Sequence, residues 1–183
     1  MISQMDDLGG RLYLVDAQDE PIGAIDRHEI PGLEASGRGF TRAVGVFVMN
    51  NQGDLWIPRR QLTKKIAPGG LDFSAGEHVG LGETYIAAAI RGLHEELRLE
   101  ADSDELTEVG IVPPFPGMPY FHRIFLFQAE TVPSYDQRDF SGYDWLAPQR
   151  LAEMLTDNTP AKEVLLPSVQ LILHNLDTTG ATA

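Results

Sequence analysis

A glycine-dense segment that leads into an amphipathic helix is the feature that most constrains this chain. Residues 69–99 read GGLDFSAGEHVGLGETYIAAAIRGLHEELRL, and the helical pattern begins near Glu83 or Thr84 and ends near Arg98. Larger apolar residues recur three and four positions apart and form one stripe that faces a core, made of Ile86, Ile90, Leu93 and Leu97. At about 100° per residue, the opposite side carries Ala88, Arg91, Gly92, Glu95 and Glu96. We therefore expect one buried face and a second face that offers carboxylates and a guanidinium.

This segment suits a divalent cation that is bound to phosphate. Glycine tolerates positive φ and has no side chain, so the backbone before the helix can approach a ligand closely. Mg²⁺ usually takes one or two carboxylates and leaves its other positions to water and substrate phosphates. Glu95 and Glu96 would supply the carboxylates, and Arg91 can hold Glu95 through their i,i+4 spacing. For a glutamate pair alone, the alternative is a solvated helix face, and the spacing of the whole segment favours the cation site.

The spacing resembles the Nudix box, G-x5-E-x7-R-E-U-x-E-E-x-G-U, where U is a bulky aliphatic residue. Glu83 is followed by seven residues and then, in register, by Arg91, Leu93, Glu95, Glu96 and Leu99. The resemblance covers about residues 76–99 and implies a Nudix fold, an α/β (α+β) domain with a mixed β-sheet sandwiched between helices. It also implies Mg²⁺-dependent cleavage of a nucleoside diphosphate linked to another group. In that family the paired glutamates bind the metal, and a loop carbonyl, here that of Gly76, often does too.

Three positions depart from the Nudix pattern. Glu77 stands six residues before Glu83, where the box has glycine, and Arg98 stands where the box ends its helix with glycine, which we interpret as a C-cap change. Gly92 occupies the place of the first glutamate of R-E-U-x-E-E, which in the family is usually a metal ligand or the candidate general base. We hypothesise that Glu77 partly replaces the missing carboxylate; the alternative is a solvated loop acid.

The other acidic and basic residues of the box receive supporting roles. Glu83 is expected to be structural, because an acid in the first turn is stabilised by the helix dipole. Arg91 is expected to orient carboxylates rather than to touch the substrate. The candidate catalytic residues are therefore Glu95, Glu96, Glu77 and Arg91, and the candidate metal ligands are Glu95, Glu96 and Gly76.

A basic cluster in an acidic chain is the second candidate binding feature. Four of the 14 lysine and arginine residues lie within seven positions, namely Arg59, Arg60, Lys64 and Lys65. Their place just ahead of the glycine segment favours a phosphate grip over solubilising loop charge, although adjacent strand residues alternate sides and only one arginine should face the cleft. Tyr120 and His122 are candidates for lining a base pocket, with a packed strand as the alternative.

Composition limits the classes of function. A chain of 183 residues fits one domain, 1–183, and its net charge of −13 argues against a nucleic-acid surface but not against a small phosphorylated substrate. No apolar run reaches the roughly 18–20 residues of a membrane helix. The absence of cysteine excludes disulfides, thiolate metal sites and cysteine nucleophiles. Because the first residues, MISQMDDLGG, also lack the regions of a signal peptide, we expect a cytoplasmic location.

The hydrophobic patterns place the remaining elements. An N-terminal hairpin is expected over about 11–27, similar to the entry segment of the isopentenyl-diphosphate-isomerase-like branch of the Nudix superfamily, and a loop over 28–41. Further strands are expected over 42–50, 54–60, 106–112, 120–130 and 143–146, helices over 148–155 and 161–176, and a frayed tail over 177–183.

We interpret the chain as a Mg²⁺- or Mn²⁺-dependent Nudix hydrolase that cleaves a diphosphate linkage in a nucleoside di- or triphosphate, or in another nucleoside diphosphate derivative. Because of Gly92, the alternative is a Nudix-fold protein that binds a nucleotide-like ligand without cleaving it. An isomerase is disfavoured, since Gly76 stands where the isomerases carry a catalytic cysteine. Nothing in the sequence marks an oligomer interface, and a homodimer stays open.

Overall fold

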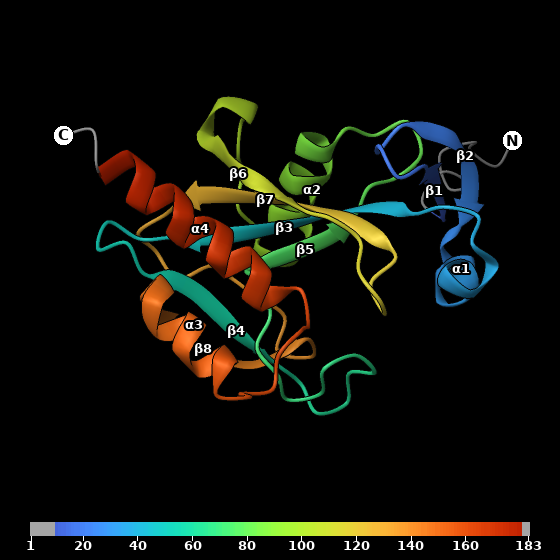
Figure 1. The fold of residues 1–183 in the computed structure, drawn as a ribbon. Coiled ribbons are helices and arrows are strands. Elements are labelled where there is room, and N and C mark those ends of the chain that lie inside the picture. The colour runs from blue at the N-terminus through green and yellow to red at the C-terminus, as the bar shows by residue number, and fades with distance from the viewer. Residues whose placement is uncertain (1–9, 181–183) are drawn as a thin grey trace, which may run out of the picture.

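The computed structural model describes residues 10–180, which form a sheet with helices on both sides (Figure 1). The strands are β1 Arg11–Val15, β2 Pro21–Asp26, β3 Thr41–Met49, β4 Leu55–Arg60, β5 Ala75–His78, β6 Leu106–Val112, β7 Tyr120–Gln128 and β8 Phe140–Leu146. The α-helices are α1 Ile30–Ser36, α2 Tyr85–Leu97, α3 Pro148–Thr156 and α4 Leu165–Gly180. Two 3-10 turns, η1 Arg27–Glu29 and η2 Ser103–Glu105, complete the described elements.

The central sheet is mixed. Its strand order is β6-β7-β3-β4-β8, and β5 pairs with β3 beside this path. β3 and β7 run parallel from the pair Thr41↔Tyr120 to the pair Met49↔Gln128, whereas the other pairs of this sheet are antiparallel. The predicted α+β class with a mixed sheet is therefore confirmed. β1 and β2 form a separate antiparallel hairpin, as expected from the sequence.

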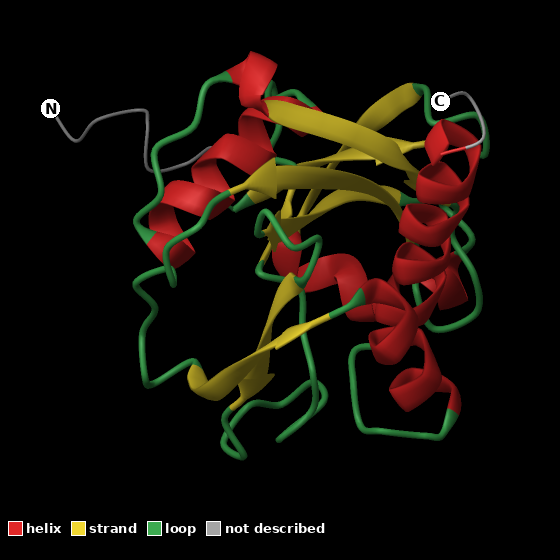
Figure 2. Ribbon diagram, turned by 90° about the vertical axis from the view of Figure 1, so that its left-hand side faces the viewer, coloured by secondary structure: helices red, strands yellow, loops and turns green. Residues whose placement is uncertain are grey.

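The helices cover the two faces of the sheet with two apolar layers (Figure 2). α2 packs Ala89, Leu93 and Leu97 against one layer, which includes Val46 and Phe125. On the other side, α3 and α4 contribute Leu151, Leu165, Val169 and Ile172 to a second layer. Every residue of β3 over 43–48 is buried, because both faces of the strand are covered there. None of the helices within 10–180 is long and apolar enough to cross a bilayer.

The ends of α2 follow from local side-chain chemistry. The hydroxyl of Thr84, the N-cap, accepts a hydrogen bond from the backbone N–H of Ala87 at 3.2 Å. Arg98 closes the helix in the left-handed conformation with φ 57°, and its N–H bonds the carbonyls of Leu93 and His94. The interpretation of Arg98 as a C-cap is confirmed.

The buried face of α2 differs from the one that the apolar spacing predicts. Ala88 and Gly92, expected on the exposed side, are buried, whereas Ile86 and Ile90 are only half-buried. The reason is that β5 packs against the Ala88 side of the helix, and the sequence of α2 gives no sign of that strand.

Other differences arise where a segment finds a distant partner. Residues 75–78 lie in the predicted glycine loop but form β5, because they pair with β3. The predicted loop 28–41 contains α1, and β8 begins at Phe140 rather than at Tyr143 because it pairs along β4. α4 begins four residues later than predicted and extends to Gly180, so 177–180 are helical. The rest of the expected frayed tail, 181–183, lies outside the described residues.

Candidate functional site

β5 and α2 bring the central residues of the candidate site together. The backbone N–H of Gly76 donates a hydrogen bond to Oε1 of Glu96 at 2.9 Å. The next residue, Glu77, extends its side chain over the bare backbone of Gly92, and a Cβ at position 92 would lie 3.2 Å from its Cγ. Ala75 closes the same contact, 3.8 Å from that Cβ position. A strand carboxylate and a helix carboxylate therefore meet along the contact between β5 and α2.

Arg91 connects most of the acidic residues around this contact. Its Nε and Nη2 bond the two carboxylate oxygens of Glu83 at 2.9 and 3.0 Å, and Nη2 also bonds the carbonyl of His78 at 3.0 Å. Its Nη1 lies 3.3 Å from Glu77 and 3.5 Å from Glu95. The Glu83 hydrogen bond raises the pKa of Arg91. Arg91 therefore contacts the carboxylates of Glu77, Glu83 and Glu95, and the roles expected for Arg91 and Glu83 stay predictions.

Glu83 is held at both of its oxygens. Besides Arg91, it accepts a hydrogen bond from the backbone N–H of Gly80 at 2.8 Å, so it fixes the turn before α2. Burial alone would raise the pKa of Glu83, but the hydrogen bonds from Arg91 and Gly80 lower it. This carboxylate therefore stays ionised, and both of its oxygens accept hydrogen bonds from within the protein.

Glu96 is the perturbed carboxylate of the site. Burial raises its pKa to about 8; the Gly76 N–H opposes that rise, and the nearby charges of Glu77 and Asp72 add to it. Partly desolvated carboxylates that repel one another favour a counter-cation, and hard oxygen donors suit Mg²⁺ or Mn²⁺. Within residues 10–180 no three histidine, aspartate or glutamate side chains converge on one metal position. The donor set therefore fits a cation that takes two carboxylates and completes its shell from backbone, water and substrate.

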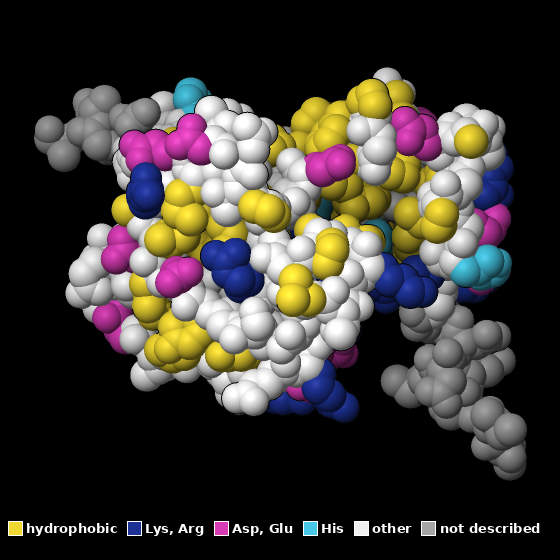
Figure 3. Space-filling view, turned by 90° about the horizontal axis from the view of Figure 1, so that it is seen from below, with side chains coloured by type: hydrophobic (Ala, Val, Ile, Leu, Met, Phe, Trp, Pro, Cys, Tyr) yellow, Lys and Arg dark blue, Asp and Glu magenta, His cyan; other side chains and the backbone are white. Residues whose placement is uncertain are grey.

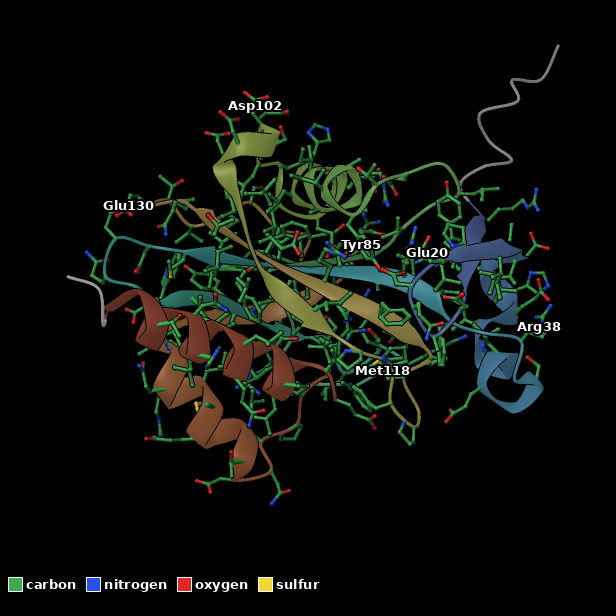
Figure 4. All side chains as sticks on the ribbon, turned by 45° about the horizontal axis from the view of Figure 1, so that its top comes forward. Glu20, Arg38, Tyr85, Asp102, Met118 and Glu130 are labelled. Carbon is green, nitrogen blue, oxygen red and sulfur yellow. The ribbon has the colours of Figure 1, made fainter. Side chains whose placement is uncertain are left out.

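A hollow of about 530 Å³ opens beside Gly76 and Glu77. Its walls include Val44, Met118 and Tyr120, and Met118 lies in the loop that joins β6 to β7 (Figure 4). In the space-filling view, histidine side chains are recessed between hydrophobic and basic groups (Figure 3). A second hollow of about 790 Å³ lies on the other side of Glu77 and contains Glu83, Arg91 and Glu95 among its lining residues.

Two neutral histidines line the 530 Å³ hollow. Burial lowers the pKa of His78 to about 4 and that of His122 to about 3, so both imidazoles are uncharged near neutral pH. His122 is 6% exposed, stacks on Phe73 with ring centroids 4.9 Å apart, and neither ring nitrogen has a hydrogen-bond partner among the described residues. Tyr120 stands edge-on to His78 at 5.3 Å. These rings therefore form an aromatic part of the wall of the hollow.

Two cations are held at the hollow by one buried acid. Asp72 pairs with Arg60 and, at 2.9 Å, with Nζ of Lys162. Both basic residues line the hollow. Lys162 belongs to no motif and carries no local signal in the sequence; its backbone N–H bonds the carbonyl of Leu71 at 3.1 Å, which brings it to the site. Neither Asp72 nor Lys162 is among the site residues that the sequence predicts.

The predicted basic cluster is dispersed. Arg60 lines the 530 Å³ hollow, whereas Arg59 donates a hydrogen bond to the carbonyl of Gly69 at 3.2 Å. Lys64 pairs with Asp139, and Lys65 is exposed. Of the four basic residues, the structure therefore brings only Arg60 to the lining of this hollow.

A further hollow of about 730 Å³ lies under the hairpin of β1 and β2, where Figure 4 labels Glu20 and Tyr85. Here Asp19 accepts hydrogen bonds from Arg42 at 2.7 Å and from the Tyr85 hydroxyl at 2.9 Å. The guanidinium of Arg123 lies over the Tyr85 ring, 4.4 Å from its centroid. These contacts attach the hairpin to the sheet and to the start of α2.

Comparison of the sequence and the fold with those of known proteins points to one family. The NUDIX domain model matches residues 39–169. An uncharacterised Nudix hydrolase of Nostoc sp. is 38% identical over 165 residues, which cover 90% of this chain and 96% of that protein. An isopentenyl-diphosphate Delta-isomerase of Streptomyces griseus is 32% identical over 78% of this chain and 73% of its own length. The crystal structure of the Deinococcus radiodurans protein DR0079 superposes with a TM-score of 0.76 and 34% identity, covering 87% of this chain and 97% of that one.

Proposed function

This chain belongs to the NUDIX domain family, and from that premise we propose that it hydrolyses a diphosphate linkage in a nucleoside di- or triphosphate or another nucleoside diphosphate derivative. The observation that carries the proposal is the meeting of Glu96, Gly76 and Glu77 beside a hollow that also holds two cations. A carboxylate group on one side and basic groups on the other suit a metal-bound diphosphate.

We assign the divalent cation, Mg²⁺ or Mn²⁺, to Glu96, Glu95 and the carbonyl of Gly76. Support comes from Glu96 itself: burial and the nearby charges of Glu77 and Asp72 raise its pKa, and a bound cation would offset both effects. When bound, the cation would lower the pKa of a coordinated water and neutralise charge on the phosphates. Glu95 is 54% exposed and tied to Arg91 at 3.5 Å, so we assign it the weaker share of binding.

The substrate would be held by the two sides of the 530 Å³ hollow. Arg60 and Lys162, fixed by Asp72, would contact the phosphates, because paired cations held by a buried acid keep their direction. Tyr120 and His122 would line the pocket for the base with their ring surfaces. The partner is therefore a small nucleotide-like molecule, and we place the protein in the cytoplasm.

The test is the release of phosphate and pyrophosphate from nucleoside diphosphates, nucleoside triphosphates and nucleotide sugars, with millimolar Mg²⁺ or Mn²⁺. Wild-type protein is measured beside Glu96→Gln, which keeps the size of the side chain and removes its charge. We expect metal-dependent turnover that the variant loses. Turnover without added metal, or turnover unchanged in Glu96→Gln, would contradict the proposal.

A second candidate function is favoured by one observation, the glycine at position 92. A protein that lacks the first glutamate of its box can retain ligand binding without hydrolysis. Binding of a nucleotide to wild-type protein, measured by calorimetry, with turnover at background would support this alternative. The isomerase activity of some relatives is not proposed, because the resemblance assigns that reaction a cysteine and this chain has none.

A further inference from the structure

Gly92 is a buried residue of α2, and the space left by its missing side chain is filled by the side chain of Glu77. A Cβ at this position would lie 3.2 Å from Cγ of Glu77, which is closer than such atoms normally pack, and 3.8 Å from its Cβ, which is an ordinary contact. Glycine in the interior of a helix lowers the stability of that helix relative to alanine. A glycine there is therefore unfavourable unless a neighbouring group needs the space that a side chain would occupy. Here the close approach is present, because the side chain of Glu77 crosses from β5 onto the bare helix backbone.

The position of Glu77 is fixed by the sheet. β5 pairs with β3 through Gly45↔Gly76 and Val44↔Glu77, so the strand sets the direction in which the carboxylate points. The side chain of Glu77 is 17% exposed and its carboxylate lies 3.3 Å from Arg91. It lines both the 530 Å³ and the 790 Å³ hollow, so it stands between the base pocket and the acidic face of α2.

Glu77 also lies beside the assigned cation ligand. The preceding residue, Gly76, donates its N–H to Oε1 of Glu96 at 2.9 Å. Gly92, on which the side chain of Glu77 packs, lies one helical turn before Glu96. Two successive residues of β5 thus contact α2 at Glu96 and at Gly92.

We propose that Glu77 and Gly92 are an exchanged pair: β5 supplies the cation-binding carboxylate that the Nudix pattern places on the helix at position 92, and Gly92 makes the room for it. The inference rests on the proposed function, because it concerns the same cation site. It accounts for two departures from the box with one contact, and it makes Glu77, rather than the more exposed Glu95, the second close carboxylate ligand of the cation beside Glu96.

The competing role for Glu77 is purely structural, as an acceptor for Arg91. A structural role predicts a change in stability without a selective loss of cation affinity. The test therefore measures Mn²⁺ binding directly, by electron paramagnetic resonance titration of free Mn²⁺ and by calorimetry, with no substrate present. Wild-type protein is compared with Glu77→Gln, Gly92→Glu and the double variant in which Glu77→Gly and Gly92→Glu are combined.

We expect Glu77→Gln to weaken Mn²⁺ binding by at least about tenfold, the scale on which even outer-shell partners of a metal affect its affinity. Gly92→Glu alone places two side chains in one space and should lower the melting temperature. The double variant should regain most of the Mn²⁺ affinity that Glu77→Gln loses, because the carboxylate returns from the helix side. Glu153→Gln, which removes an exposed carboxylate on α3 that lines none of the hollows described above, is the control and should bind like wild type.

Two results would overturn the inference: wild-type affinity for Mn²⁺ in Glu77→Gln, or a folded double variant that binds no better than Glu77→Gln. If the double variant does not fold, the near-isosteric Glu77→Gln still decides the question. The inference and the proposed function fail separately. If Mn²⁺ binding depends on Glu77 but no hydrolysis is found, only the proposed function is contradicted. If hydrolysis depends on Glu96 but Mn²⁺ binding is unchanged in Glu77→Gln, only the inference is contradicted.

Discussion

Arg91 and Glu83 form a two-pronged ion pair, with Nε–Oε1 at 2.9 Å and Nη2–Oε2 at 3.0 Å. The pair joins the body of α2 to the turn that precedes it, where Glu83 also accepts the N–H of Gly80. A planar guanidinium matches a carboxylate through two parallel bonds, which a lysine ammonium cannot reproduce. The geometry of the acidic face therefore depends on arginine specifically.

Arg91→Ala should lower the free energy of unfolding by about 1–3 kcal/mol, because it leaves partly buried acceptors without their charged donor. Arg91→Lys should recover only a small part of that loss, since it cannot bond both oxygens of Glu83 and the carbonyl of His78. Urea denaturation of the three proteins measures the difference. Equal stability of Arg91→Lys and wild type would show that the paired hydrogen bonds of the guanidinium to Glu83 are unimportant for stability.

The two adjacent glutamates should differ in their effect on hydrolysis. Glu96→Gln should lower kcat by roughly 10²-fold or more, whereas Glu95→Gln should act mainly on the metal requirement. The reason is that Glu96 is held by the Gly76 N–H, while Glu95 is 54% exposed and in contact with Arg91 at 3.5 Å. Rates at increasing Mg²⁺ test this. Rescue of Glu96→Gln by excess Mg²⁺, but not of Glu95→Gln, would reverse the assignment.

His122 should make stability depend on pH. Burial lowers its pKa to about 3 from an ordinary 6.5, so between these values the unfolded chain binds a proton that the folded protein excludes. The neutral His122 side chain therefore gives its full contribution to the free energy of unfolding only above pH 6.5. That free energy falls as the pH falls, by roughly 1–2 kcal/mol between pH 6.5 and 5.

The measurement is urea denaturation of wild type and His122→Phe at pH 7 and pH 5. The free energy of unfolding of the variant, relative to that of wild type, should be higher at pH 5 than at pH 7. Glu96, whose pKa burial raises to about 8, gives an opposite slope, but it is present in both proteins and cancels in the difference. An identical difference at the two pH values would mean that His122 is not excluded from protonation.

Gly45 is required by a close approach of an aromatic ring. A Cβ at this position would lie 2.6 Å from Cε1 of Phe73, whose ring is already packed on Phe47 and His122. Gly45→Ala should cost about 1–3 kcal/mol of stability through overpacking. Gly142→Ala on β8 is the matched control, since no atom lies within 4 Å of its added Cβ. Equal effects of the two substitutions in thermal unfolding would contradict this explanation.

The sequence predicts best what is decided by nearby residues. The limits of α2, its Thr84 start and its Arg98 cap depend on side chains within one turn, so the local pattern is sufficient. The Glu77–Gly92 contact joins positions on two elements, and the sequence could mark each as a departure without showing that they touch. Lys162 is further removed, because only pairing with Leu71 brings it to the hollow.

The predicted basic cluster was dispersed for a related reason. Closeness in sequence does not give side chains a common direction, and the fold gives three residues of the cluster, Arg59, Arg60 and Lys64, three different partners. Lys64 found Asp139, which precedes β8, and Arg60 found Asp72. Helix periodicity was likewise insufficient for Ala88, because burial on that side is created by a strand outside the helix.

β3 and β4 share only the pair Met49↔Leu55 and then separate. At the separation, the Ser74 hydroxyl accepts the N–H of Val48 at 2.8 Å and donates to the carbonyl of Trp56 at 2.6 Å, so the segment that leads into β5 is bonded to both strands. On ligand binding, β5 should therefore stay in place while the loop 61–70 moves. Amide hydrogen exchange should be slow and unchanged at 75–78, while a ligand should slow exchange in 61–70, the loop that exposes Leu62 and Ile66.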